Sequence, residues 1–173
     1  THEATEQNLK NAKAAIDRIL DLRPQLRLEL TDEQAGGAYP DDILLNAMYT
    51  GGYIFGLIGH ISKRIVYFAN KNNIPAVNVR QGYAKCSSCI VSYGALITSD
   101  ASIAKAARDN SLDVLSIRPG NISLEGADYG FIGGASGYDD SGVYFCGDIT
   151  THPDYVIIRD FCLKHGKSVV SLS

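Results

Sequence analysis

The sequence predicts an α/β protein that is built from repeated ββαβ units. Two apolar runs around a tight glycine-containing turn, a segment of helical spacing and a short closing strand follow one another three times. The closing strands "AVNVRQG" and "VLSIRPG" match, and in the second strand Tyr53–Phe55 matches Ala95–Ile97 and Val143–Phe145. Repetition at such a period is typical of solenoids, propellers and arrays.

The segment before the repeats is interpreted as part of a further unit. Apolar residues at helical spacing predict an amphipathic helix that ends before Pro24: Leu9, Ala12, Ile16, Ile19 and Leu20. The stretch "LRLEL", residues 26–30, alternates apolar and polar residues as a half-buried strand does. We therefore expect one domain over residues 1–173, made of a partial first unit and three full units: 1–38, 39–82, 83–120 and 121–173.

Several residues mark where the helices of the units begin and end. Ser99 or Asp100 can accept hydrogen bonds from the free N–H groups ahead of "SIAKAA". Pro153 suits a first helical turn, and Asp154 behind it favours the helix dipole. Gly166 stands where the C-cap of the third helix is expected.

Composition restricts the class of partner. The chain has a formal net charge of −3 with dispersed Lys and Arg, whereas nucleic-acid binding needs clustered cations, so no nucleic-acid partner is predicted. No apolar run approaches the roughly 20 residues that span a bilayer, so no membrane partner is predicted either. Four cysteines are too few for a disulfide scaffold, and we expect a cytoplasmic protein.

The spacing C-x-x-C occurs once, at Cys86 and Cys89. Zinc needs about four N or S ligands and a second such pair is absent, since Cys146 or His152 would join only by tertiary coincidence; we predict no metal and no cofactor. If the motif lies in one extended strand, the two thiols face opposite sides and cannot easily pair. Two readings stay open: two buried structural cysteines, or one cysteine that acts as a nucleophile, with Lys85 favouring its thiolate.

Several motifs in order resemble the pentein fold, the five-bladed α/β propeller of guanidino-group-modifying enzymes. They are "PDDILLNA", "QGYAKCSSCIV", "IRPGNI" with "DYGFIGGASG", and "GDITTHPDY", and they cover roughly residues 39 to 173. More narrowly, they look like an uncharacterised bacterial branch of that superfamily. The resemblance implies an incomplete propeller of about three and a half to four units. An unpaired terminal strand favours a homo-oligomer.

The resemblance also implies a central channel lined by the first strand of each unit, "DDILLNA", "KCSSCIV" and "FIGGASG". Alignment on the hairpins places Asn46, Cys89 and approximately Gly134 at one depth, and Asp42 and Lys85 near the mouth. The glycines of "GFIGGASG", Gly133 and Gly134, mark a close approach of another backbone or of a ligand.

Two further motifs have an implied role and a structural alternative. "HPD", His152 and Asp154, resembles the His-x-acid pair in which His moves protons and the acid holds substrate; the alternative is a helix cap. Asp128 reaches a cationic ligand or caps a turn. The implied function is binding or hydrolysis of a small guanidino or amidine compound by a deiminase- or amidinotransferase-like enzyme with a cysteine nucleophile, Cys89 or Cys86. The nucleophile of the characterised enzymes lies in the last unit, so an inactive ligand-binding or assembly module is the alternative.

Overall fold

The computed structural model describes residues 2–172, apart from the side chains of residues 2–5 and 8. The chain divides into two compact units, Thr1–Asp32 and Glu33–Ser173. No helix among the described residues is long and apolar enough to cross a membrane.

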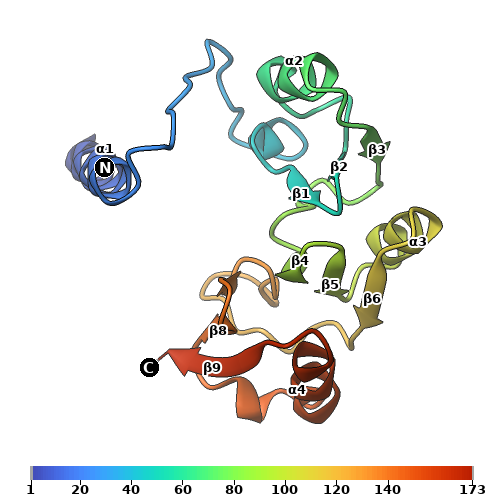
Figure 1. The fold of residues 1–173 in the computed structure, drawn as a ribbon. Coiled ribbons are helices and arrows are strands. Elements are labelled where there is room, and N and C mark those ends of the chain that lie inside the picture. The colour runs from blue at the N-terminus through green and yellow to red at the C-terminus, as the bar shows by residue number, and fades with distance from the viewer. Residues whose placement is uncertain (1, 173) are drawn as a thin grey trace. The chain divides into compact units, whose positions relative to one another are not determined.

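The first unit consists of helix α1 (His2–Leu22) and an irregular segment (Figure 1). The predicted helix is confirmed, but two residues of its apolar stripe, Leu9 and Ile19, are exposed. The strand predicted over residues 26–30 is wrong, because this stretch pairs with no other strand in the described part of the chain. Leu26 and Leu30 are exposed accordingly. Apolar alternation produces a strand only where a neighbouring strand accepts its hydrogen bonds.

The second unit contains three small mixed sheets, each of three strands (Figure 1). In each sheet the first two strands are antiparallel and the third is parallel to the second, with a helix between them. The ββαβ order is thus present in all three; a propeller and its count of units stay predictions. The first sheet has β1 (Met48–Thr50), β2 (Tyr53–Gly56), α2 (Lys63–Lys71) and β3 (Ala76–Asn78). The second has β4 (Ser88–Ser92), β5 (Ala95–Thr98), α3 (Ala101–Asp109) and β6 (Asp113–Ser116). The third has β7 (Ser136–Tyr138), β8 (Gly142–Cys146), α4 (Tyr155–Lys164) and β9 (Ser168–Leu172).

The strand register defines which residues are equivalent. The helix C-caps provide a common reference point: Asn72, Asn110 and His165. Five residues after each C-cap, the closing strand pairs with the second strand of its sheet: Val77 with Phe55, Leu115 with Ile97, and Val170 with Tyr144. This gives three equivalent rows across the sheets: Met48–Phe55–Val77, Cys89–Ile97–Leu115 and Gly137–Tyr144–Val170. The match of Tyr53–Phe55 to Ala95–Ile97 is confirmed, whereas in the third unit the equivalent residues are Gly142–Tyr144, one position earlier than predicted.

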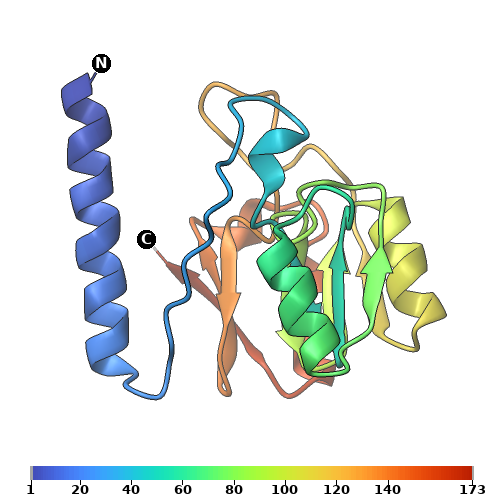
Figure 2. The same cartoon turned by 90° about the horizontal axis from the view of Figure 1, so that it is seen from above.

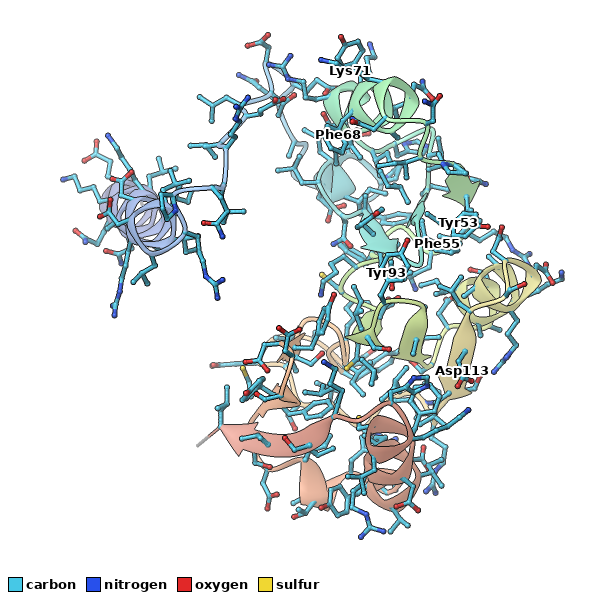
Figure 3. All side chains as sticks on the ribbon, in the orientation of Figure 1. Tyr53, Phe55, Phe68, Lys71, Tyr93 and Asp113 are labelled. Carbon is cyan, nitrogen blue, oxygen red and sulfur yellow. The ribbon has the colours of Figure 1, made fainter. Side chains whose placement is uncertain are left out.

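The apolar core is shared between consecutive sheets. One cluster joins Met48 and Phe55 of the first sheet to Leu96 and to Ile103 of α3. The rings of Tyr53 and Phe55, labelled in Figure 3, lie with their centroids 6.1 Å apart. A second cluster joins the second sheet to the third sheet and α4: Cys89, Ile97, Val143, Phe145 and Ile158. A third, smaller cluster lies between the first sheet and its own helix α2, seen beside β2 in Figure 2.

The stretches ahead of β1, β4 and β7 are turns, and the prediction that they are extended strands is wrong. Asp41–Ile43 forms a 3₁₀ helix, and the N–H of Ser87 donates to the carbonyl of Tyr83 at 2.8 Å. Residues 132–135 also form a turn. Each turn tightens the chain at the point where it enters a new sheet, so side chains before the strand no longer alternate between two faces.

Candidate functional site

A pocket of about 530 Å³ lies where β8 ends, beside the turn that carries Cys86. Its walls come from both the second and the third sheet regions. The polar groups among its lining residues include two thiols, an imidazole and a carboxylate: Cys86, Cys146, His152 and Asp148. Phe131 and Phe145 supply aromatic wall. A concave, partly apolar site with a few convergent polar groups is typical of small-molecule sites.

Cys86 is fixed by Asn46, which precedes β1. The amide nitrogen of Asn46 donates to Cys86 Sγ at 3.1 Å. Its oxygen accepts the backbone N–H groups of Lys85, at 2.8 Å, and of Cys86, at 3.2 Å. Cys86 is half-buried and its thiol is free. The predicted site residues Asn46, Lys85 and Cys86 are therefore brought together.

The two glycines of the third unit pack against the same turn. A Cβ atom on Gly133 would lie 2.2 Å from the carbonyl oxygen of Ser88 and 2.4 Å from that of Lys85. The ammonium of Lys85 donates to the carbonyl of Gly133 at 3.1 Å, and the N–H of Gly134 donates to that of Cys86 at 2.9 Å. Gly133 thus allows the backbone of Lys85 and Ser88 to lie against it, and Gly134 lines the pocket.

His152 is buried, with 5% of its surface exposed, at the end of the 3₁₀ helix η2 (Ile149–Thr151). Its Nδ1 accepts the N–H of Asp154 at 3.0 Å, so in the neutral ring the proton is on Nε2. Nε2 has no partner among the described residues. Burial lowers the pKa of His152, which favours the neutral ring. His152 lines the pocket, and its Nε2 is a buried polar atom without a partner among the described residues.

Asp154 is engaged away from the pocket. It accepts the backbone N–H of Arg118 at 2.7 Å and the Nε–H at 2.8 Å, and these contacts lower the pKa of Asp154. It occupies the N-cap position of α4 but makes no side-chain cap hydrogen bond. The helix cap suggested for "HPD" is present in part: Asp154 is the N-cap residue of α4 and His152 accepts its N–H, but the Asp154 carboxylate pairs with Arg118 and not with the helix.

Sequence reasoning did not single out Asp148 or Cys146 as pocket residues. Asp148 accepts from the N–H and the hydroxyl of Thr150, which lower its pKa and keep it ionised at neutral pH. Cys146 is an exposed free thiol at the end of β8. The available signal was the "GDITTHPDY" motif, which places Asp148 four residues before His152 and two after Cys146.

Cys89 lies elsewhere, in the core. It is fully buried within the cluster that joins the second and third sheets, and burial raises the pKa of its thiol to about 12. Such a thiol stays protonated, unlike a nucleophile. Cys86 lies on the turn and Cys89 in β4, so the two do not share one strand; both are free. The described residues contain no cluster of three or more groups that could hold a metal ion.

The remaining predicted carboxylates do not line the pocket. Asp42 accepts from the hydroxyl of Tyr83 at 2.5 Å. The ring centroid of Tyr83 lies 5.8 Å from that of Tyr39 and 5.5 Å from that of Phe131. Asp42 therefore contacts Tyr83, which packs on the pocket residue Phe131, and does not line the pocket itself. Asp128 is exposed in the loop before β7.

The mixed α/β fold of small sheets is similar to that of pentein-fold enzymes. The agmatine deiminase of C. jejuni matches 93% of this chain with a TM-score of 0.54 and 10% sequence identity, and its substrate-bound cysteine-to-serine mutant matches 92%, with the same score and identity. DDAH from Pseudomonas aeruginosa, a mutant complexed with citrulline, matches 74% at 11% identity with a TM-score of 0.47. The chain spans about half the length of these structures, 56%, 56% and 47%.

The family itself is defined by a match over nearly the whole chain. Residues 4–173 match the family of unknown function DUF6873, and the chain belongs to that family. A comparison with curated proteins gives no match.

Proposed function

We propose that the pocket beside Cys86 binds a small guanidino- or amidine-type compound and that Cys86 attacks its central carbon. The observation that carries the proposal is that a thiol, an imidazole and an ionised carboxylate, those of Cys86, His152 and Asp148, line one cavity of about 530 Å³. The similarity of fold to agmatine deiminase supports it. The proposal includes a pentein-like α/β propeller as the fold of the family.

Each group has a role that its chemistry permits. The Asp148 carboxylate attracts the delocalised cation, and Phe131 offers it a ring face. Asn46 orients Cys86 Sγ by its amide N–H, and Lys85 stays bound to Gly133 as part of the frame. The imidazole of His152 forms part of the pocket wall, and its buried Nε2–H would donate to the ligand only after a small rotation of the ring.

The reaction balances without a cofactor. Sγ forms a bond to the guanidinium carbon, and ammonia leaves with the proton that the thiol loses, which gives an S-linked amidinium. Water then adds to this carbon and the C–S bond breaks, so that a urea group, the free thiol and one proton result. The sum consumes one water and releases ammonium.

Binding without turnover is the second candidate, and one observation favours it. In the tautomer that the contact with Asp154 implies, His152 cannot take a proton at Nε2, and Nδ1 is occupied by the N–H of Asp154. A base that is held in this way does not activate a thiol or water toward the pocket. The two candidates share the ligand class and differ in whether ammonia is released.

Alkylation with a matched pair of reagents tests the site. Chloroacetamidine carries a cation and chloroacetamide is its neutral counterpart, so we expect the amidine to label Cys86 about tenfold faster, a preference of about 1.4 kcal/mol. Asp148→Asn is expected to remove the preference, whereas Asp140→Asn, outside the pocket lining, is the control. Peptide mass spectrometry locates the label. Equal rates with both reagents would contradict the proposal, and an assay for ammonia with guanidino compounds separates turnover from binding.

A further inference from the structure

The connection between β6 and β7 is longer than its counterpart in the preceding unit. Nineteen residues, 117–135, separate β6 from β7, whereas nine residues, 79–87, separate β3 from β4. Figure 2 shows the longer connection as a loop that extends away from the sheets. A loop of more than about 12–15 residues without secondary structure is uncommon in a compact domain and is typical of functional loops such as active-site lids.

The base of this loop is fixed on both sides. Near its start, Arg118 donates through its backbone N–H and its Nε–H to the carboxylate of Asp154, at 2.7 and 2.8 Å. Farther along, the N–H of Gly130 donates to the carbonyl of Ile122 at 2.7 Å. A Cβ atom on Gly130 would lie 3.2 Å from side-chain atoms of Ile122 and Leu124, so the two sides of the loop are in close contact there. Residues 122 and 130 therefore form a narrow neck.

Beyond this neck lies a tip, residues 123–129, which we call the lid. All seven of its residues are exposed, whereas Ile122 is half-buried and Gly130 is buried. Gly126, in the middle of the lid, has a φ of 79°, which glycine adopts without strain. The lid is thus a short exposed turn on a fixed neck, and segments of this kind change position at low cost in free energy.

The lid adjoins the pocket of Cys86. Ser123 and Leu124 belong to the pocket lining, together with the neck and Phe131. Leu124 is 55% exposed, and Tyr129, at the other end of the lid, is 46% exposed. Movement of the lid into the pocket would remove both apolar side chains from water, and this burial favours a closed position.

The charges of the lid make closure depend on a cation. Its sequence, "SLEGADY", contains two acidic residues and no basic residue. When no cation is bound, the carboxylates of Glu125 and Asp128 are repelled by the ionised carboxylate of Asp148, which lines the pocket. A cation beside Asp148 cancels this repulsion and attracts the lid.

We propose that residues 123–129 close over the pocket when a cationic ligand binds there. Leu124 and Tyr129 then cover the ligand, and the closed lid excludes water from Cys86 and the bound group. The proposal rests on the proposed function in one respect, because it takes from it the cationic ligand of this pocket. It does not require turnover.

A tryptophan reporter tests closure, because the chain contains no Trp. Tyr129→Trp places the reporter on the lid. Tyr138→Trp, in β7 and outside the pocket lining, is the matched control, since both tyrosines are 46% exposed. Both variants are made in Cys146→Ser, so that the label goes to Cys86, and Cys86→Ser in the same chain gives the background.

Two reagents separate charge from size. Chloroacetamidine attaches a cation to Cys86 and chloroacetamide a neutral group of nearly the same size, and intact mass confirms each adduct. With the amidine adduct we expect the emission of Tyr129→Trp to move to shorter wavelength and its quenching by acrylamide to fall severalfold. The amide adduct and the Tyr138→Trp control are expected to show neither change. Glu125→Gln with Asp128→Asn is expected to abolish the response, whereas Asp140→Asn retains it.

Proteolysis gives a second readout, in Cys146→Ser without a reporter. Glu125 is the one glutamate in residues 34–173, so a glutamate-specific protease cuts the second compact unit in the lid. Cleavage there is expected to slow severalfold in the amidine adduct, and cleavage at the exposed Glu29 of the first compact unit is the internal control.

The outcomes distinguish this proposal from the proposed function. A labelled Cys86 without a change at the lid would overturn the lid and leave the proposed function standing. Equal responses to both adducts would also overturn the proposal, because closure would then not depend on a cation. If Cys86 takes neither reagent, both proposals are wrong, since an open lid must admit a small reagent to the pocket.

Discussion

Asn46 holds Cys86 from a distance of forty residues along the chain, with its amide nitrogen 3.1 Å from the sulfur. The amide oxygen accepts two backbone N–H groups, so the nitrogen must face Sγ. A side chain that precedes the first sheet therefore orients a thiol that precedes the second sheet. This contact allows a substitution that separates the sulfur contact from the backbone contacts.

Asn46→Asp is expected to slow alkylation of Cys86 by iodoacetamide about tenfold at neutral pH. The carboxylate still accepts the N–H groups of Lys85 and Cys86, but it removes the donor to Sγ and places an anion beside the reacting sulfur. Loss of one hydrogen bond to a charged group is worth about 1.5–3 kcal/mol, or tenfold and more in rate. Peptide mass spectrometry over a time course measures the rate.

Cys146 in the same sample is the internal control, because Asn46 does not contact it in the described structure. Its alkylation rate is expected to stay unchanged. An unchanged rate at Cys86 would show that Asn46 does not act on the sulfur.

Stability is expected to fall below about pH 6.5 through His152. Burial lowers the pKa of His152 in the folded state from its ordinary 6.5, so between the two values the unfolded chain binds more protons. The contribution of His152 to stability is therefore complete above pH 6.5 and is lost as pH falls toward the folded-state pKa. Urea unfolding at a series of pH values measures the slope.

His152→Gln, which stays neutral throughout this range, is the matched variant. It is expected to be less stable than wild type at pH 7.5, with a difference that narrows as pH falls below 6.5. A difference that is constant over the range would mean that folding does not shift the pKa of His152.

Gly133→Ala is expected to destabilise the protein by about 3 kcal/mol, because its Cβ would meet the carbonyl oxygens of Ser88 and Lys85 at 2.2 and 2.4 Å. The backbone there must shift, and the hydrogen bond from Lys85 to Gly133 with it. Gly37→Ala, where a Cβ meets nothing within 4 Å, is the control. Urea unfolding compares the two, and equal stabilities would show that the contact relaxes at no cost.

The ββαβ order was predictable because each element has a local signal. Asp100, one of two predicted N-caps, accepts from the N–H of Ile103, and Gly166 adopts a φ of 69° after α4. The third unit was misaligned by one residue because Gly142 stands where the other units have Tyr53 and Ala95. A match of apolar residues cannot detect such a shift, whereas strand pairing does.

The site was predictable only in part. Cys86 and Cys89 are equivalent candidates in the sequence, and the turn before β4 separates them: one reaches the pocket and the other the core. Alternation rules do not foresee a turn at the start of a strand. The contact of Asn46 with Cys86 and the pairing of Asp154 with Arg118 join residues about forty positions apart, so no local pattern encodes them.

Because each of the two larger core clusters takes side chains from two consecutive sheets, a sheet with its helix cut out at its loops would lose apolar neighbours that bury its own interior. Shortened versions made for expression or recombination should therefore keep neighbouring sheets together. A cut between β6 and β7, for example, would leave Ile97 and Val143 in separate fragments, each with an apolar surface open to water.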